Sequence, residues 1–145
     1  MKIVIQRVTR SAVRVAGEEI AAIARGLLLL VGAEKGDSDE PVQWLAEKIL
    51  NLRIFSDGSG KMNLSCRDVA GEILVVSQFT LAGDCTRGRR PGFGQAAPPD
   101  KAERLYRLLI QELSASKLRV VAGKFGADMQ VALENDGPVT FILER

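Results

Sequence analysis

A continuous apolar run near the start of the chain places the strongest constraint on the fold. The run extends from Leu27 to Val31, and Gly26 and Gly32 stand on either side of it. Alternate side chains of a strand point to opposite faces of the sheet, so a strand that is apolar throughout is buried on both faces. Residues 27–31 therefore predict a central strand with other elements packed above and below it.

The segments around this run predict an α/β domain. Two helices are expected, each with an apolar stripe. One opens with acidic residues and proline at 37–41 and runs to about residue 52, and the other opens with Pro99 and Asp100. Since no repeat or linker interrupts the chain, we expect residues 1–145 to form a single domain, with two helices packed on a largely antiparallel, barrel-like sheet. Besides the central run, strands are expected at residues 2–8, 11–15, 18–24, 72–77, 119–122, 129–133 and 139–143.

The chain contains no histidine, which excludes Ser-His and Cys-His catalysis, histidine general bases and the usual catalytic zinc sites. Its two cysteines, Cys66 and Cys85, lack metal-binding spacing and are expected to be free thiols in a reducing compartment. A net charge of +2 requires any contact with nucleic acid to be local. Because no apolar run is long enough to span a membrane and no signal-like segment appears, a cytoplasmic protein is expected.

The first candidate site is the motif Ser77-Gln78-Phe79-Thr80, at the end of a strand predicted to be buried. A strand that turns polar where it leaves the core can present hydroxyl and N–H groups to a ligand. Ser77 or Thr80 would lack a base as a nucleophile, because no histidine exists and the motif holds no carboxylate or lysine. On the pattern alone, the favoured interpretation is that these polar residues simply end a strand.

The second candidate is a segment without periodicity, residues 81–99, which is rich in glycine, arginine and proline. Arg87, Arg89 and Arg90 suit phosphate groups, and Phe93 suits base stacking. A solvated surface loop is the alternative. A third, weaker candidate is the glycine-punctuated turn at residues 123–129, where backbone can approach a ligand closely.

The fourth candidate lies near the end of the chain, where Asn135-Asp136-Gly137 precedes Pro138 and an apolar strand. Proline donates no N–H and is confined to strand starts, edges and bulges. A tight turn feeding a terminal strand is one interpretation. The other is that the Gly137–Pro138 peptide is held in an unusual geometry, cis included, because its carbonyl groups have a function.

Together these segments resemble the D-aminoacyl-tRNA deacylase (D-tyrosyl-tRNA deacylase) family. The resemblance covers the chain from Met1 to about Leu143 and is carried by four stretches, "MKIVIQRVTRSAV", "SQFTL", "GRRPGF" and "GADMQVALENDGPVTF". It implies an ester hydrolase that removes D-amino acids, and glycine in some cases, from tRNA as chiral proofreading in translation. It also implies a homodimer that needs no metal or other cofactor.

The resemblance further assigns the site residues. Ser77, Gln78, Phe79 and Thr80 are expected to form the catalytic end of the strand. Gly137 and Pro138, joined by a cis peptide and supported by Arg7, are expected to enter the active site of the partner subunit and reject L-amino acids. Phe125 and Met129 are expected near the terminal adenosine, and Arg87, Arg89 and Arg90 near tRNA phosphates.

Three other functions remain open at the level of sequence. A non-catalytic RNA-binding barrel would use the arginines and Phe93 and would bind tRNA without hydrolysing the ester. A hydrolase of small D-amino esters would turn over free esters equally well. A dimerising scaffold with no site would tolerate changes in "SQFTL" (residues 77–81) and "NDGPVT" (residues 135–140).

Overall fold

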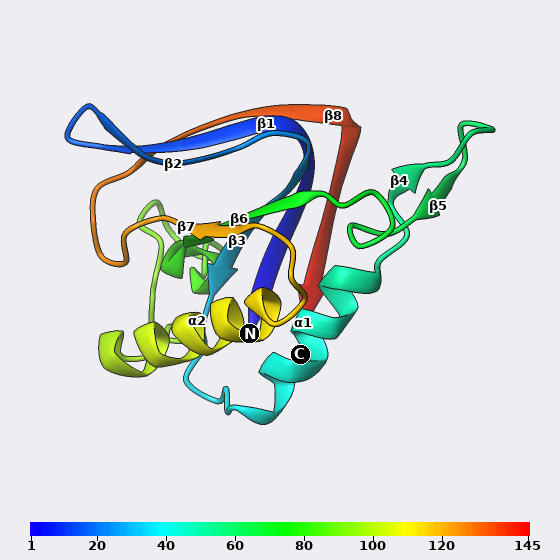
Figure 1. The fold of residues 1–145 in the computed structure, drawn as a ribbon. Helices are drawn as coiled ribbons and strands as arrows, with labels where there is room; N and C mark the ends of the chain where they lie inside the picture. The colour runs from blue at the N-terminus through cyan, green and yellow to red at the C-terminus, as the bar shows by residue number, and fades with distance from the viewer.

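Strand β1 (Lys2–Val15) organises the sheet because it pairs with three other strands, all of them antiparallel to it. Its first half pairs with β3 (Gly26–Gly32) and its second half with β2 (Glu18–Ile23). Along its opposite edge it pairs with β8 (Gln130–Glu144). The computed structural model, which describes residues 1–145, shows β1 and β8 bending together (Figure 1). β8 pairs with no strand other than β1, so its outer edge is open.

The apolar run forms β3, which is central as the sequence predicts. Beyond it lie β6 (Glu72–Ser77) and β7 (Val120–Ala122), and both pairings are parallel, so the sheet is mixed. Leu27 and Leu29 face the main core, whereas Leu28 faces a second apolar cluster on the other side of the sheet. The expected burial on both faces of this strand is therefore confirmed.

Two helices cover one face of the sheet, α1 (Glu40–Asn51) and α2 (Pro99–Ser114), as Figure 1 shows. No helix combines the length and apolar character needed to cross a membrane. The predicted α/β domain with two helices on a barrel-like sheet is confirmed. The helix residues buried in the core are Val42, Leu45, Ala46, Ile49 and Leu50 of α1 and Leu105, Tyr106, Leu109 and Leu113 of α2.

Two sequence-based interpretations, the separate opening strands and the tight turn at residues 135–137, are wrong. Residues 2–8 and 11–15 belong to one strand rather than two, because β8 pairs with β1 across the point where they were expected to separate. Residues 135–137 do not reverse the chain, because β8 continues through them. The hairpin formed by β4 (Phe55–Ser56) and β5 (Met62–Leu64) was not predicted from the sequence.

Candidate functional site

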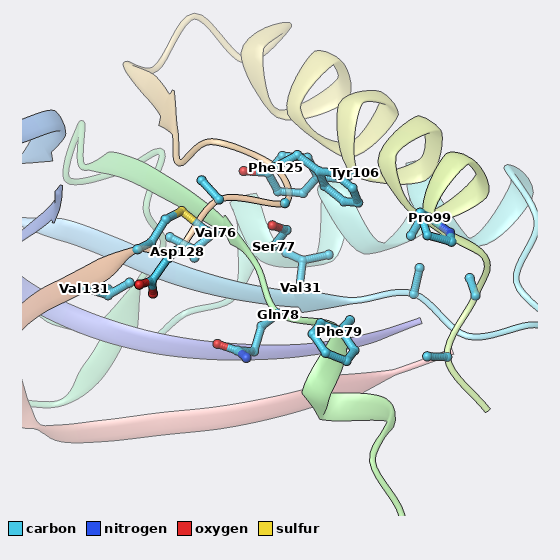
Figure 2. A pocket seen from close by; sticks show the side chains of 17 residues that line it. Val31, Val76, Ser77, Gln78, Phe79, Pro99, Tyr106, Phe125, Asp128 and Val131 are labelled. Atoms are coloured by element: carbon cyan, nitrogen blue, oxygen red, sulfur yellow. The ribbon is translucent and has the colours of Figure 1, made fainter. Parts of the chain in front are cut away.

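A cavity of about 510 Å³ opens between the end of β6, the start of α2 and the segment before β8 (Figure 2). The surrounding residues are mainly apolar, as in sites that bind small organic groups. Ser77 and Gln78 supply polar groups from β6 and the residue after it, and Asp128 supplies a carboxylate. The apolar and aromatic lining includes Val31, Val76, Phe79, Pro99, Ala102, Tyr106, Phe125, Met129 and Val131.

The end of β6 is shaped by a short 3₁₀ helix, η1 (Phe79–Ala82), which follows the strand at once. The N–H of Gln78 donates to the main-chain oxygen of Val31 at 2.7 Å, which holds this strand end to β3. The first N–H groups of a 3₁₀ helix lack partners within the helix, here those of Phe79 and Thr80. Main-chain donors are thereby placed beside the cavity.

The hydroxyl of Thr80 has no base next to it. Its oxygen accepts a hydrogen bond from the side-chain amide of Gln78 at 2.5 Å, and no carboxylate or lysine bonds to it. Thr80 is also exposed and is not part of the cavity lining. This environment does not activate Thr80 as a nucleophile.

Tyr106 forms part of the cavity wall from α2 and stays neutral. Its hydroxyl donates to the main-chain oxygen of Val75 at 2.7 Å, and its ring packs against that of Phe125 with centroids 5.8 Å apart. Burial raises the pKa of Tyr106 above its ordinary value. The side chain therefore serves as a fixed wall rather than as an acid or base.

The Gly137–Pro138 peptide is cis and lies in a bulge of β8, outside the cavity lining of its own chain. In the pairing of β1 with β8, Gln6 lies opposite Thr140 and Val8 lies opposite Asn135. Only one residue of β1 separates these two pairs, so residues 136–139 of β8 protrude as a bulge. Asn135 closes the bulge: its side-chain oxygen accepts from the N–H of Val139 at 2.7 Å. Both Gly137 and Pro138 are exposed.

Arg7 fixes the bulge from β1. Its Nε donates to the main-chain oxygen of Asp136 at 3.0 Å, and the carboxylate of the same residue lies 3.2 Å from that nitrogen. The guanidinium also donates to the main-chain oxygen of Ile54. Arg7 is only 7% exposed, so these bonds are made in a water-poor environment, where charge-assisted bonds are strong.

Glycine is required at position 137 for two reasons. Its φ of +132° is a conformation that side chains other than glycine rarely adopt. A Cβ there would also lie 2.9 Å from Nη2 of Arg7 and 2.8 Å from a methyl group of Val139.

The arginine-rich segment forms an exposed loop closed at its base. The N–H and carbonyl groups of Asp84 and Gly92 bond reciprocally at 2.7 and 2.8 Å. Inside the loop, the carboxylate of Asp84 accepts from the hydroxyl and N–H of Thr86, which lowers the pKa of that carboxyl. The arginines of the loop, at positions 87, 89 and 90, are exposed and form no salt bridge.

The expected site residues thus fall into three groups. Ser77, Gln78 and Phe79 meet Phe125 and Met129 in one cavity, and Thr80 follows next to it. Arg7 meets the Gly137–Pro138 segment on another part of the chain, and the arginines occupy the exposed loop.

The roles of two residues in these places were not predicted from the sequence. Asn135 closes the bulge, and Tyr106 lines the cavity. The amide two residues before a Gly-Pro pair was a usable signal for the first. Tyr106 was expected only in the apolar stripe of its helix, since helical periodicity does not distinguish a core position from a cavity wall.

Comparison with known proteins identifies the family of this chain. Residues 4–144 match the family described as D-Tyr-tRNA(Tyr) deacylase. A D-aminoacyl-tRNA deacylase of Pelobacter propionicus is 57% identical over 145 residues, with all of both chains covered. One of Thermosipho africanus is 53% identical over 144 residues, covering 99% of this chain and 97% of the relative.

Two solved structures share the fold. One, described as a c-Myc DNA unwinding element binding protein, is 46% identical with a TM-score of 0.93, covering 100% of this chain and 99% of the other. The other is described as a probable eukaryotic D-amino acid tRNA deacylase. It is 18% identical with a TM-score of 0.86, covering 98% of this chain and 97% of the other. With a family match over nearly the whole length and relatives above half identity, the chain belongs to the D-Tyr-tRNA(Tyr) deacylase family of enzymes.

Proposed function

We propose that this protein hydrolyses the ester bond of D-aminoacyl-tRNA and of some glycyl-tRNA, and that it does so as a homodimer with active sites shared between subunits. One observation carries the proposal: the motif at residues 77–80 and the Gly137–Pro138 segment lie apart within one chain. Ser77, Gln78 and Phe79 line the cavity, whereas Gly137 and Pro138 are exposed on β8 and do not. In the dimer, the Gly137–Pro138 segment of each chain completes the cavity of its partner.

The exposed character of β8 supports such a dimer. Its outer edge is unpaired over a strand of 15 residues, and long open edges are normally covered. Apolar side chains are also exposed along β8: Leu133 is 38% exposed, Phe141 39% and Ile142 63%. A second copy of the chain would cover this surface, and a two-fold axis would place each exposed bulge against the other subunit.

The bulge suits chiral selection. Its carbonyl oxygens accept hydrogen bonds from the substrate's ammonium group and occupy the volume that an L side chain needs, whereas a D side chain points away. Rejection by a clash works only if the obstructing groups do not yield. Arg7 and Asn135 bond to main-chain atoms on both sides of Gly137–Pro138 and keep them in place. Glycine has no side chain, so glycyl-tRNA escapes rejection.

The chemistry needs no side-chain base. An aminoacyl ester is already activated, and the vicinal 2′-hydroxyl of the terminal ribose assists the attacking water. The N–H groups of Phe79 and Thr80 stabilise the oxyanion, a contribution of ~3 kcal/mol for one such donor. Substrate-assisted attack is favoured over a covalent Thr80 intermediate because the hydroxyl of Thr80 has only the amide of Gln78 as a partner. The apolar wall at Phe125 and Met129 takes the adenosine.

Deacylation of D-tyrosyl-, L-tyrosyl- and glycyl-tRNA by the purified protein, with and without chelator, tests the proposal. We expect loss of the D-tyrosyl and glycyl esters, little loss of the L-tyrosyl ester, and no effect of the chelator. Equal loss of D- and L-esters, or dependence on metal, contradicts it. Binding of tRNA without turnover would instead indicate a non-catalytic RNA-binding domain, and comparable turnover of free D-tyrosyl esters a small-ester hydrolase.

A further inference from the structure

An exposed aromatic pair stands where the cavity meets the arginine loop. The rings of Phe79 and Phe93 lie with centroids 5.0 Å apart and an interplanar angle of 59°. Phe79 belongs to the cavity lining, yet it is 57% exposed, so it lies at the opening (Figure 2). Phe93 is 40% exposed and lies outside the lining, which extends the aromatic surface away from the cavity.

The position of Phe93 is well defined although it belongs to a loop. The reciprocal main-chain bonds between Asp84 and Gly92 close the loop immediately before it. Its own main-chain oxygen accepts from the N–H of Ala96 at 3.1 Å. Its ring packs so closely on Gly83 that a Cβ there would lie 3.1 Å from it. A ring held in this way loses little conformational entropy when a ligand stacks on it.

Positive charge accompanies the pair. Arg87, Arg89 and Arg90 occupy the tip of the loop that ends at Phe93, and none of them is neutralised by a carboxylate. Exposed aromatic faces beside unpaired arginines are the combination by which proteins bind single-stranded nucleic acid, since bases stack on the rings and phosphates meet the cations.

We propose that Phe79 and Phe93 form a stacking subsite for the base of the nucleotide that precedes the terminal adenosine of the RNA substrate. The inference rests on the proposed function, in which the cavity takes that adenosine. The preceding nucleotide then leaves at the cavity opening, where the aromatic pair lies, and its phosphate runs toward the arginine loop. A D side chain is the competing occupant, but apart from those of aspartate and glutamate such side chains bring no negative charge to match the three arginines.

Six binding constants test this subsite. The probes are an RNA minihelix with a single-stranded 3′ end and the same RNA with an abasic residue before the terminal adenosine. Each is titrated with wild-type protein, with Phe93→Leu and with Phe93→Tyr at one salt concentration. The abasic residue should weaken wild-type binding about 5- to 150-fold, as expected for one stacked base. In Phe93→Leu this penalty should vanish, and in Phe93→Tyr, which keeps the planar ring, it should persist.

Equal binding of the two RNAs by wild-type protein, or an undiminished penalty in Phe93→Leu, overturns the subsite. So does a loss of hydrolysis in Phe93→Leu that affects D-tyrosyl-tRNA but spares D-alanyl-tRNA, because the ring would then contact the amino-acid side chain. Hydrolysis of D-tyrosyl-tRNA by the same wild-type preparation reports on the proposed function separately. Hydrolysis without a loss of affinity for the abasic RNA contradicts the subsite alone. A loss of affinity for the abasic RNA without hydrolysis contradicts the proposed function but supports the stacking subsite.

Discussion

The guanidinium of Arg7 donates to the main-chain oxygen of Asp136 at 3.0 Å and thereby ties the first strand of the sheet to the bulge in the last one. The two residues are 129 positions apart in the sequence. Because the same side chain also holds the main-chain oxygen of Ile54, it connects the bulge to the base of the β4–β5 hairpin as well. The proposed selection of D-substrates depends on this arrangement.

Replacing Arg7 with lysine should relax chiral selection. Lysine keeps the charge but lacks the planar fork that reaches two carbonyl groups from fixed directions. Loss of one charge-assisted bond is worth ~1.5–3 kcal/mol, so the ratio of kcat/KM for D- over L-tyrosyl-tRNA should fall by at least about tenfold. Arg10→Lys is the matched control, since Arg10 also bridges β1 and β8, to Glu134, but is exposed. An Arg7→Lys variant with native stability and an unchanged ratio would refute the supporting role.

Replacing Gly137 with alanine should cost more stability than the same change at Gly17. Both glycines have positive φ, +132° and +84°, but only position 137 also lacks space for a Cβ. The strain alone is worth ~1–3 kcal/mol, which is the expected loss for Gly17→Ala. For Gly137→Ala the contacts with Arg7 and Val139 add to it. Free energies of unfolding from urea titration measure the difference, and equal losses would show that the bulge adjusts easily.

Removing the three loop arginines should reduce the salt dependence of tRNA binding. Each phosphate contact contributes ~0.7–0.9 to the slope of log K against log salt concentration, so Arg87→Gln, Arg89→Gln and Arg90→Gln together should lower the slope by about 2. The control carries the same change at Arg14, Arg67 and Arg107, which already pair with carboxylates. If both triple variants keep the wild-type slope, the loop does not contact the phosphates.

The two cysteines should differ sharply in reactivity. Cys66 is fully buried, and burial raises its pKa to about 12, whereas Cys85 is exposed. Because the thiolate is the reactive species, iodoacetamide at pH 8 should modify Cys85 alone in the native protein and both residues after denaturation. Mass spectrometry of the peptides decides between these outcomes, and rapid native labelling of Cys66 would contradict the buried position.

The same thiol predicts a pH dependence of stability. The pKa of Cys66 is higher in the folded state than the ordinary value of 9.0 because the thiol is buried, so folding favours the protonated form. The contribution of the buried Cys66 thiol to the free energy of unfolding is complete below pH 9 and is lost as the pH rises toward 12. Cys66→Ala should therefore show a smaller decline in unfolding free energy over this range than the wild-type protein, and identical declines would argue against the shift.

The elements that local pattern determines were predictable. Leu27 to Val31 are apolar on every residue and could only form a strand buried on both faces, and the two helices carry apolar stripes after acidic starts. The cavity residues Ser77, Gln78 and Phe79 stood out because polar residues follow a buried strand abruptly.

What the sequence left undecided depends on distant partners. Residues 135–137 have the composition of a tight turn, but β1 pairs with β8 on both sides of them and makes them a bulge instead. Asn135 gains its role only because Val139 is folded back within reach of its side chain. The hairpin of β4 and β5 was missed because strands of two and three residues give almost no periodic signal.

Subunit complementation tests the shared active site most directly. Ala102→Trp fills the cavity, and Gly137→Ala disrupts the bulge, so each variant alone should be inactive on D-tyrosyl-tRNA. When the two are co-expressed and the mixed dimer is isolated by two affinity tags, one of its two sites combines an intact cavity with an intact bulge. The account predicts restored D-selective hydrolysis in the mixed dimer. A mixed dimer as inactive as its parents would show that each chain builds its site alone.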